Sequence, residues 1–298
     1  VCMSDFSVDQ EQIDLPRGAF FKSARTFVQW QGRTVIGLGQ NDHRAYLYPV
    51  LTPAGFPLTT ESPVDHPHHN SVWVGADHVT ALLPFDDDRY EEATYSFYIN
   101  ETFQGRAPGR IVSRSIEHEE RSENHLRLVQ TLDWQGPVEW GAPAGRTIAV
   151  ETRTFDVRPG KTLHAIDIAS RLSPTEWDLR IGPTRHAWFG IRVAEPLRPG
   201  LGGIKTLSKG DWVHLGGEFA AGHRAGLAVC RSPELAGEPW SIHDWGTIDV
   251  NPLVQQPCEL SPGDSLVVSI RLLAHDGPLD EASISDQYRR FVETGAPS

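Results

Sequence analysis

The sequence predicts an all-β protein, a large antiparallel β-sandwich with one helix at its carboxyl end. Two observations lead to this fold class. Apolar and polar residues alternate along many short segments, which is typical of antiparallel strands with one buried face. The chain also contains 27 glycines and 22 prolines, scattered between these segments where tight turns would join the strands.

The strand-like segments begin with a hairpin near the amino end. Residues 27–31 and 34–38 both have strand character, and Gly32 and Arg33 between them predict a turn. Further strands are expected at residues 125–134, 147–157, 162–171 and 265–273. Because each segment has one apolar face, the pattern indicates sheets that bury one side.

One amphipathic helix is expected near the carboxyl end. Residues 278–281 open it with proline and two acidic side chains, which favour a helix amino terminus. Four apolar residues then fall on one helical face: Ile284, Tyr288, Phe291 and Val292. The helix should end near Gly295 and pack on the sandwich.

Length, composition and charge exclude several classes of protein. The 298 residues are 39% hydrophobic, 22% charged and 9% aromatic, and we expect one β-supersandwich domain over residues 1–298. The net charge of −12 disfavours nucleic acid and anionic membranes as partners, because both need a basic surface. No stretch approaches 18 apolar residues, so no membrane-spanning helix is expected.

The three cysteines are Cys2, Cys230 and Cys258, and their spacing fits neither a disulfide framework nor a zinc site. Cys230 ends the apolar run 227–230, which is typical of a buried, reduced thiol. Reduced thiols are usual in the cytoplasm, so a cytoplasmic location is expected.

The most informative segment is residues 65–69, which place Asp65, His66, His68 and His69 around Pro67. If the chain is extended here, His66 and His68 point to one face and His69 to the other. Imidazole titrates near neutrality and also binds metals. Three interpretations therefore stay open: a solvated loop, a substrate or catalytic site, and a metal site with His66 and His68 as ligands.

A second candidate segment covers residues 182–193. His186 and Arg192 share strand parity, and the fork of Arg192 suits a carboxylate or sugar hydroxyls. The alternative interpretation of His186 is a core histidine among aromatic residues.

A third candidate segment covers residues 238–246. His243 and Asp244 stand between Trp240 and Trp245, which resembles a sugar-binding platform with aromatic faces and polar neighbours. A tryptophan-rich edge of the core is the alternative interpretation. Asn251 follows closely and is expected to complete such a site.

Two other patterns are interpreted as loops. The acidic cluster at residues 86–88 lacks the ligand spacing of a calcium loop. The glycines at residues 200–203 do not link a strand to a helix, as a dinucleotide-binding fingerprint would.

These segments resemble a family of bacterial proteins usually labelled PmoA-like, or "methane oxygenase PmoA". The resemblance covers roughly residues 25–280, and the motif at residues 65–69 is its most specific part. Weaker matches follow in family order at residues 44–55, 151–153, 190–193, 239–252 and 260–277. The resemblance implies a galactose mutarotase-like supersandwich that holds carbohydrates. It also implies a pathway neighbour of the Gfo/Idh/MocA type of sugar oxidoreductase.

The first functional hypothesis is an enzyme that acts on a sugar or keto-sugar by acid/base proton transfer, as an epimerase, mutarotase, isomerase or lyase. In this hypothesis His66 or His68 is the acid, His243 or Asp244 is the base, and His186 is a further catalytic candidate. The expected substrate-binding residues are Arg44, Tyr48, Asp65, His69, Trp73, Glu151, Arg192, Trp240 and Asn251.

Two further hypotheses come from other classes of protein. One is a non-catalytic carbohydrate-binding protein, which would use the same aromatic platform. The other is a metal enzyme with His66, His68 and, in a larger ligand set, His69 as ligands. Apart from such a transition metal no cofactor is expected, and the oligomeric state is left open.

Overall fold

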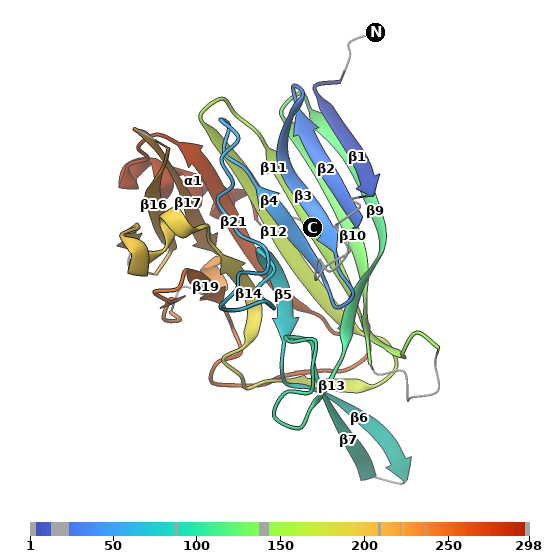
Figure 1. The fold of residues 1–298 in the computed structure, drawn as a ribbon. Coiled ribbons are helices and arrows are strands. Elements are labelled where there is room, and N and C mark those ends of the chain that lie inside the picture. Colours follow the sequence, from blue (N-terminus) through green and yellow to red (C-terminus); the bar gives the residue numbers. More distant parts are fainter. Residues whose placement is uncertain are drawn as a thin grey trace.

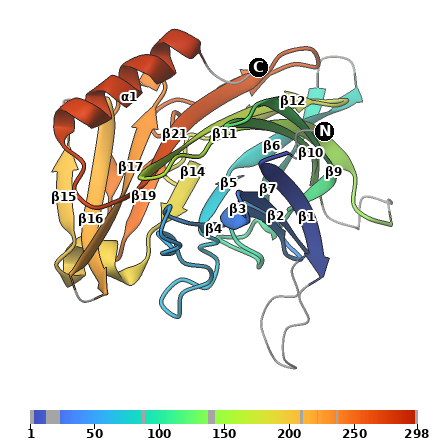
Figure 2. The same cartoon turned by 90° about the horizontal axis from the view of Figure 1, so that it is seen from above.

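Two eight-stranded antiparallel sheets form a sandwich, and a five-stranded sheet extends one end of it (Figures 1 and 2). The structure is a computed structural model that describes residues 4–12, 24–86, 89–136, 143–207, 210–220, 222–235 and 237–295. The predicted all-β fold class is confirmed. The apolar faces of the two large sheets build the main core between them.

The first sheet carries the amino-terminal strands and the strands that support the candidate site. Its order is β1 (Phe6–Gln12), β2 (Ala24–Trp30), β3 (Arg33–Gln40), β4 (Ala45–Val50), β5 (Val72–Ala76), β14 (Ala187–Arg192), β19 (Thr247–Val250) and β18 (Ser241–Ile242). The predicted hairpin is β2–β3. Its turn lies at Gln31 and Gly32, one residue earlier than expected, because both adopt the positive φ angles that primed hairpin turns require.

The second large sheet contains the longest strands. Its order is β15 (Ile204–Leu207), β16 (Trp212–Ala220), β17 (His223–Arg231), β21 (Leu266–Asp276), β12 (Leu163–Pro174), β11 (Thr147–Arg158), β10 (His125–Gln135) and β9 (Arg110–Ser122). The four strands predicted after the first hairpin correspond to β10, β11, β12 and β21. In β10 every second side chain is buried, as the alternation predicted.

The third sheet has the order β20 (Cys258–Leu260), β13 (Asp178–Ile181), β6 (Val79–Asp86), β7 (Arg89–Ser96) and β8 (Ala107–Pro108). The β6–β7 hairpin projects from the sandwich (Figure 1). Asp86 ends β6 instead of lying in a loop, and the other two residues of the acidic cluster lie outside the described residues.

In the described part of the chain, short 3-10 turns occur at η2 (Glu195–Leu197), η3 (Pro199–Leu201) and η4 (Pro233–Leu235). The glycine-rich segment at residues 200–203 passes through η3, and Gly202 then takes a φ of 94°. It opens no α-helix, so its interpretation as a loop is confirmed.

The predicted helix is α1 (Glu281–Thr294), which lies across the outer face of the second sheet (Figure 2). The Asp280 side chain caps it by accepting a hydrogen bond from the Ser283 amide, and the helix ends at Gly295 as expected. Ile284 and Phe291 pack against the sheet, whereas Val292 is 41% exposed and lies outside the expected contact. No helix in the described part of the chain is long and apolar enough to cross a membrane.

Cys230 lies under this helix as a fully buried free thiol, as predicted. Burial raises the pKa of its thiol to about 12. Cys258 is also free, and Cys2 lies outside the described residues.

Candidate functional site

One pocket of about 370 Å³ brings together residues from all three segments that the sequence singled out. Most of its lining residues lie in β18 and β19 and in the segments that precede β5 and β14, strands that are neighbours in the first sheet. Its walls are His66, His68, His69, Tyr98, Ile99, Phe103, Arg185, His186, Ser241, His243, Trp245, Thr247 and Asp249.

The histidine segment is a pair of turns and not an extended strand. The His66 amide donates to the Pro63 carbonyl at 3.0 Å, and the His69 amide donates to the His66 carbonyl at 2.9 Å. The prediction that His69 points away from His66 and His68 is therefore wrong, since turns do not follow the two-residue period of a strand. All three rings line the pocket, and His66 stacks on His69 with centroids 4.5 Å apart.

Arg192 anchors this segment to β14. Its guanidinium donates to both carboxylate oxygens of Asp65, at 2.8 and 2.7 Å, and it also lies 3.4 Å from Nδ1 of His69. Partial burial opposes ionisation of Asp65, but the hydrogen bonds from Arg192 and His66 lower its pKa to about 2. Because Arg192 is buried and its fork is occupied, the expected role in orienting substrate does not fit; it positions the histidines instead.

Replacing Asp65 by asparagine is expected to loosen the histidine segment while leaving the fold intact. The change removes the counter-charge of the buried Arg192 but leaves an amide oxygen that can accept one of its hydrogen bonds, so it should cost about 1–3 kcal/mol of global stability. Hydrogen exchange should show faster exchange at residues 63–71 than in the parent protein. The control is Asp286→Asn, which removes an exposed pair on α1 and should leave that segment unchanged. Equal exchange in both variants would contradict the anchoring role.

Asp77 and His186 form the first imidazole–carboxylate pair of the pocket. Asp77 follows β5, and its Oδ2 lies 3.0 Å from Nδ1 of His186, which precedes β14. The hydroxyl of Thr184 and the ring of His78 also bond to this carboxylate. Burial opposes ionisation of Asp77, but these hydrogen bonds hold its pKa well below the usual range. An ionised Asp77 fixes the proton of His186 on Nδ1 and leaves Nε2 as the acceptor.

Asp249 and His243 form the second pair. Nε2 of His243 lies 3.1 Å from the Ser241 hydroxyl and 3.4 Å from Oδ2 of Asp249. A tight turn closed by Gly246, with a φ of 90°, stacks Trp245 on His243 at 4.2 Å. Trp245 keeps 37% of its surface exposed, so the pocket presents an accessible aromatic ring beside this pair.

Tyr98 joins the histidine segment to the first pair. Its ring stacks on His186 at 4.8 Å, and its hydroxyl lies 3.2 Å from Nε2 of His69. Burial raises the pKa of the phenol, so Tyr98 is neutral at pH 7. Its carbonyl oxygen accepts a hydrogen bond from Arg44, which is fully buried.

Arg44 and Trp73 support the pocket from behind, and neither lines it. The Arg44 guanidinium lies 5.9 Å from the ring centroids of both Trp73 and Tyr98. Burial lowers the pKa of Arg44 to about 9, which still leaves it charged at pH 7. Trp73 stacks under His69 at 4.9 Å, so these two expected substrate-binding residues act through their neighbours.

Glu151 belongs to the core and not to the pocket. It is fully buried, and its two oxygens accept hydrogen bonds from Arg153, Ser170 and Trp134. The expected role in substrate binding is therefore wrong. The alternation on β11 placed Glu151 correctly on a strand, but the ion pair that keeps it inside depends on tertiary packing.

Four further candidates also lie outside the pocket walls: Tyr48, Trp240, Asp244 and Asn251. Tyr48 packs under Arg25, and Trp240 packs under Arg231. The Asp244 carbonyl accepts the Gly200 amide. The Asn251 amide donates to the Thr184 carbonyl at 2.8 Å, so Asn251 braces the turn that carries His186.

Burial keeps several histidines neutral. It lowers the pKa of His68 to about 4, helped by the nearby charge of Arg44, and lowers the pKa of His69 to about 2, helped by His68 and His66. Outside the pocket, burial also lowers the pKa of His164 and of His214 to about 4. These rings are therefore uncharged in the folded protein at neutral pH.

The protein is expected to lose stability as the pH falls from about 6.5 to 4. In that range the unfolded chain takes up protons on histidines that stay neutral in the folded state, so acid favours unfolding, while above pH 6.5 the contribution is fully present. Urea unfolding at pH 7.5 and pH 4.5 should differ by at least about 2 kcal/mol. His164→Gln should reduce this difference, and a stability that is constant over the range would contradict the prediction.

A metal centre does not fit the histidine segment. Among the residues that the structure describes, no three His, Cys, Asp or Glu side chains are arranged to hold a metal ion. The rings of His66 and His69 stack face to face, with only 9° between their planes, and His68 meets His69 edge-on. The donor atoms therefore do not converge as a ligand set requires.

Several residues of the site were missed in the sequence, among them Asp77, Tyr98 and Asp249. Asp77 and His78 directly follow the buried strand 72–76, which was a usable signal, because polar groups at strand ends often serve a site. Asp249 lies inside strand β19, and Tyr98 lies in a bend two residues after β7, and neither carries such a signal.

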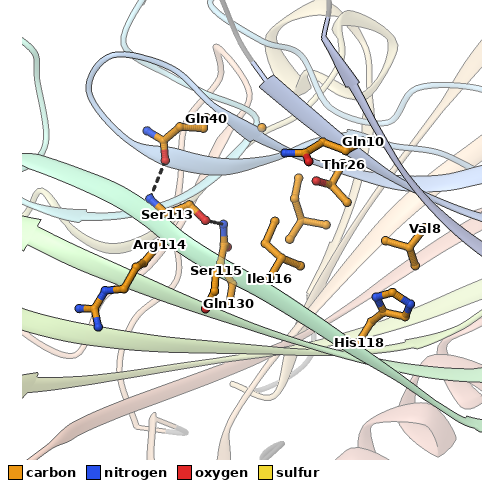
Figure 3. Close-up of a pocket in the computed structure, with 12 residues that line it drawn as sticks. Val8, Gln10, Thr26, Gln40, Ser113, Arg114, Ser115, Ile116, His118 and Gln130 are labelled. Atoms are coloured by element: carbon orange, nitrogen blue, oxygen red, sulfur yellow. Dashed lines mark hydrogen bonds between the residues drawn. The ribbon is translucent and has the colours of Figure 1, made fainter.

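Another cavity, of about 490 Å³, lies between β1–β3 and β9–β10 (Figure 3). Its polar groups bond to one another: the Ser113 amide donates to Gln40, and the Gln130 amide donates to the Ser113 hydroxyl (Figure 3). None of the residues lining it is acidic, so it lacks the imidazole–carboxylate pairs of the first pocket.

The fold and the pocket thus define an all-β protein with a histidine-rich site on its first sheet. The chain matches the model of a protein family described as "Family of unknown function (DUF6807)" over residues 25–289, and it belongs to that family. No curated protein matches its sequence.

Three solved structures show partial similarity. The Slr1438 protein from Synechocystis sp. PCC 6803 is 10% identical with a TM-score of 0.37, over 81% of this chain and 92% of that chain. A putative kojibiose phosphorylase from the human microbiome is 9% identical with a TM-score of 0.32, over 87% of this chain. The polysaccharide lyase BACCELL_00875 is 11% identical with a TM-score of 0.27, over 99% of this chain. The chain spans 31% and 35% of the length of the latter two.

Proposed function

We propose that this protein is an enzyme that moves protons on a sugar or keto-sugar, as an epimerase, mutarotase or isomerase does. The observation that carries the proposal is that two histidines in the walls of one pocket, His186 and His243, are each paired with a carboxylate, that of the buried Asp77 and that of Asp249. Reactions of this class need a base and an acid that reach the same substrate. The pocket offers one histidine from the bend before β14 and another from the turn between β18 and β19.

His186 is the proposed base. Asp77 accepts the Nδ1 proton at 3.0 Å, so the lone pair is on Nε2, and ionised Asp77 stabilises the imidazolium that forms after proton abstraction. This nitrogen accepts a hydrogen bond from Nε of Arg185 at 3.2 Å, so the substrate must displace that donor before its proton can be abstracted. An oxyanion that develops on the substrate can be stabilised by the charge of Arg185.

The proton donor is assigned to His243, whose ring is held by Ser241 and Asp249. This assignment differs from the roles expected from the sequence, where His66 or His68 was the acid and His243 or Asp244 the base. Because the pKa of His68 is lowered to about 4, that ring is neutral at pH 7 and serves as a hydrogen-bonding partner.

A sugar ring fits the remaining walls. Trp245, Tyr98 and Phe103 present aromatic surface, and aromatic faces pack against the C–H groups of a sugar. Thr247 and Ser241 add hydroxyl groups beside these rings, so the pocket combines apolar faces with a few polar groups, as small-molecule sites do.

The proposal is tested by proton exchange in heavy water. Aldohexoses and their keto-sugar forms are incubated with the protein in D2O, and NMR follows solvent deuterium at ring carbons and the exchange of anomers. We expect catalysed exchange for at least one sugar. If calorimetry shows sugar binding whose affinity is constant from pH 5 to 8, and no proton exchange occurs, the result would instead support the hypothesis of a non-catalytic carbohydrate-binding protein. Absence of both binding and exchange would overturn the carbohydrate assignment.

A further inference from the structure

A further cavity, of about 300 Å³, adjoins the pocket that contains His186 and His243. The two share His68 and Ile99 as walls, so they meet at the ring of one histidine. The cavity is built from three loops: residues 41–43 between β3 and β4, residues 67–70 of the histidine segment, and residues 99–101 after β7. Both volumes lie at the lower end of the range for small-ligand sites, about 300–1,000 Å³.

One wall of this cavity is a buried histidine, His43, whose only hydrogen-bonding contact is a poor one with the backbone of Gly109. His43 is only 4% exposed, and neither of its ring nitrogens makes a hydrogen bond of normal geometry, although the backbone of Gly109 lies close by. A buried polar group left unpaired is costly. A neutral imidazole has one donor and one acceptor, which is the pairing that a hydroxyl group satisfies.

The rim of the cavity favours a neutral, hydroxyl-rich ligand. Asn100 is exposed there, as are the carboxylates of Asp42 and Glu101, and Asn70 lies buried at the base. Amides and carboxylates accept hydrogen bonds from hydroxyl groups, whereas two acidic side chains repel an anionic ligand. The chemistry therefore differs from that of the pocket, where imidazoles and aromatic rings predominate.

We infer that the substrate is a neutral disaccharide or other glycoside, with its reacting ring in the pocket of His186 and His243 and its second ring in the cavity of His43 and Asn100. His68, which both spaces share, then lies at the glycosidic bridge. This inference rests on the proposed function and adds to it the size and class of the substrate.

The test measures binding of D-glucose and D-galactose, and of maltose, cellobiose and lactose, by calorimetry. For at least one disaccharide we expect binding about tenfold or more tighter than for its monosaccharide, or about 1.4 kcal/mol. Asn100→Trp fills the rim of the cavity from an exposed position, and His43→Phe removes the unpaired nitrogens. In each variant the dissociation constant of the monosaccharide, divided by that of the disaccharide, should fall to about one. Asn124→Trp, at an exposed turn that lines neither space, should keep the parent ratio.

Two results would overturn the inference. One is that no disaccharide binds more tightly than its monosaccharide; the other is that Asn100→Trp retains the parent ratio. If monosaccharides still exchange protons with solvent in a His186-dependent manner, only the second ring site is wrong and the proposed function stands. If no sugar binds or exchanges, both are wrong. His43 is buried, so a failure of His43→Phe to fold leaves Asn100→Trp as the deciding variant.

Discussion

His186→Gln is expected to lower kcat for the sugar identified in heavy water by about 10²–10⁴-fold, the usual contribution of a general base. Glutamine keeps polarity near the ring position but cannot accept a proton at neutral pH. Binding should change little, because His186 is one of many walls of the pocket. The measurements are kcat and KM by NMR, together with solvent deuterium incorporation at the reacting carbon.

His78→Gln provides a matched control for this prediction. His78 bonds to the same carboxylate as His186, with Nδ1 3.0 Å from Oδ1 of Asp77, yet it does not line the pocket. If Asp77 acts through His186, the His78 variant should retain kcat within about threefold, which is less than 1 kcal/mol. Equal losses in the two variants would show that the Asp77 cluster is structural, and activity that persists in His186→Gln would remove His186 from the mechanism.

Glu151→Ala is expected to lower the free energy of unfolding by about 3–5 kcal/mol, because it leaves a buried charge uncompensated. Arg153 is 3% exposed and donates to both oxygens of Glu151, at 2.8 and 2.9 Å. The substitution also removes the hydrogen-bond acceptor of Ser170 and Trp134, which donate to the same carboxylate at 2.7 and 3.0 Å. Urea unfolding at pH 7 measures the loss.

The control for Glu151 is Glu119→Ala, which breaks an ion pair with Arg121 on the exposed part of β9. This change should stay within about 0.5 kcal/mol, as most exposed substitutions do. The folded Glu151 variant should bind sugar as the parent protein does, since Glu151 lies outside the pocket. A raised KM with unchanged stability would instead restore Glu151 as a substrate-binding residue.

Local patterns predicted the elements of the fold well. The alternation over residues 125–134 corresponds to β10, and the apolar face centred on Ile284 and Phe291 corresponds to α1. These predictions succeeded because backbone geometry sets the periods of strand and helix, whatever the neighbouring elements are. The same rule failed at residues 65–69, where two turns replace the strand and all three histidines reach the pocket.

The histidines of the candidate site could be predicted from the sequence, but the carboxylates that pair with them could not. His66, His68, His186 and His243 were identified from the sequence, and the structure brings them to one pocket. The carboxylate of the first pair could not be identified, because Asp77 and His186 are separated by 109 positions and meet only when β5 pairs with β14. Local spacing contains no information about contacts made at that distance along the chain.

The sequence by itself therefore determined the β2–β3 hairpin, four strands of the second sheet, the carboxyl-terminal helix and the unusual density of imidazoles at residues 65–69. Only the tertiary structure decided what each polar residue does. Arg192 is occupied by Asp65, 127 positions away, and Glu151 is enclosed by the core, whereas Trp245 remains accessible beside His243. The physical reason is that periodicity is a property of the backbone, while the partner of a charge is decided by which strands lie side by side.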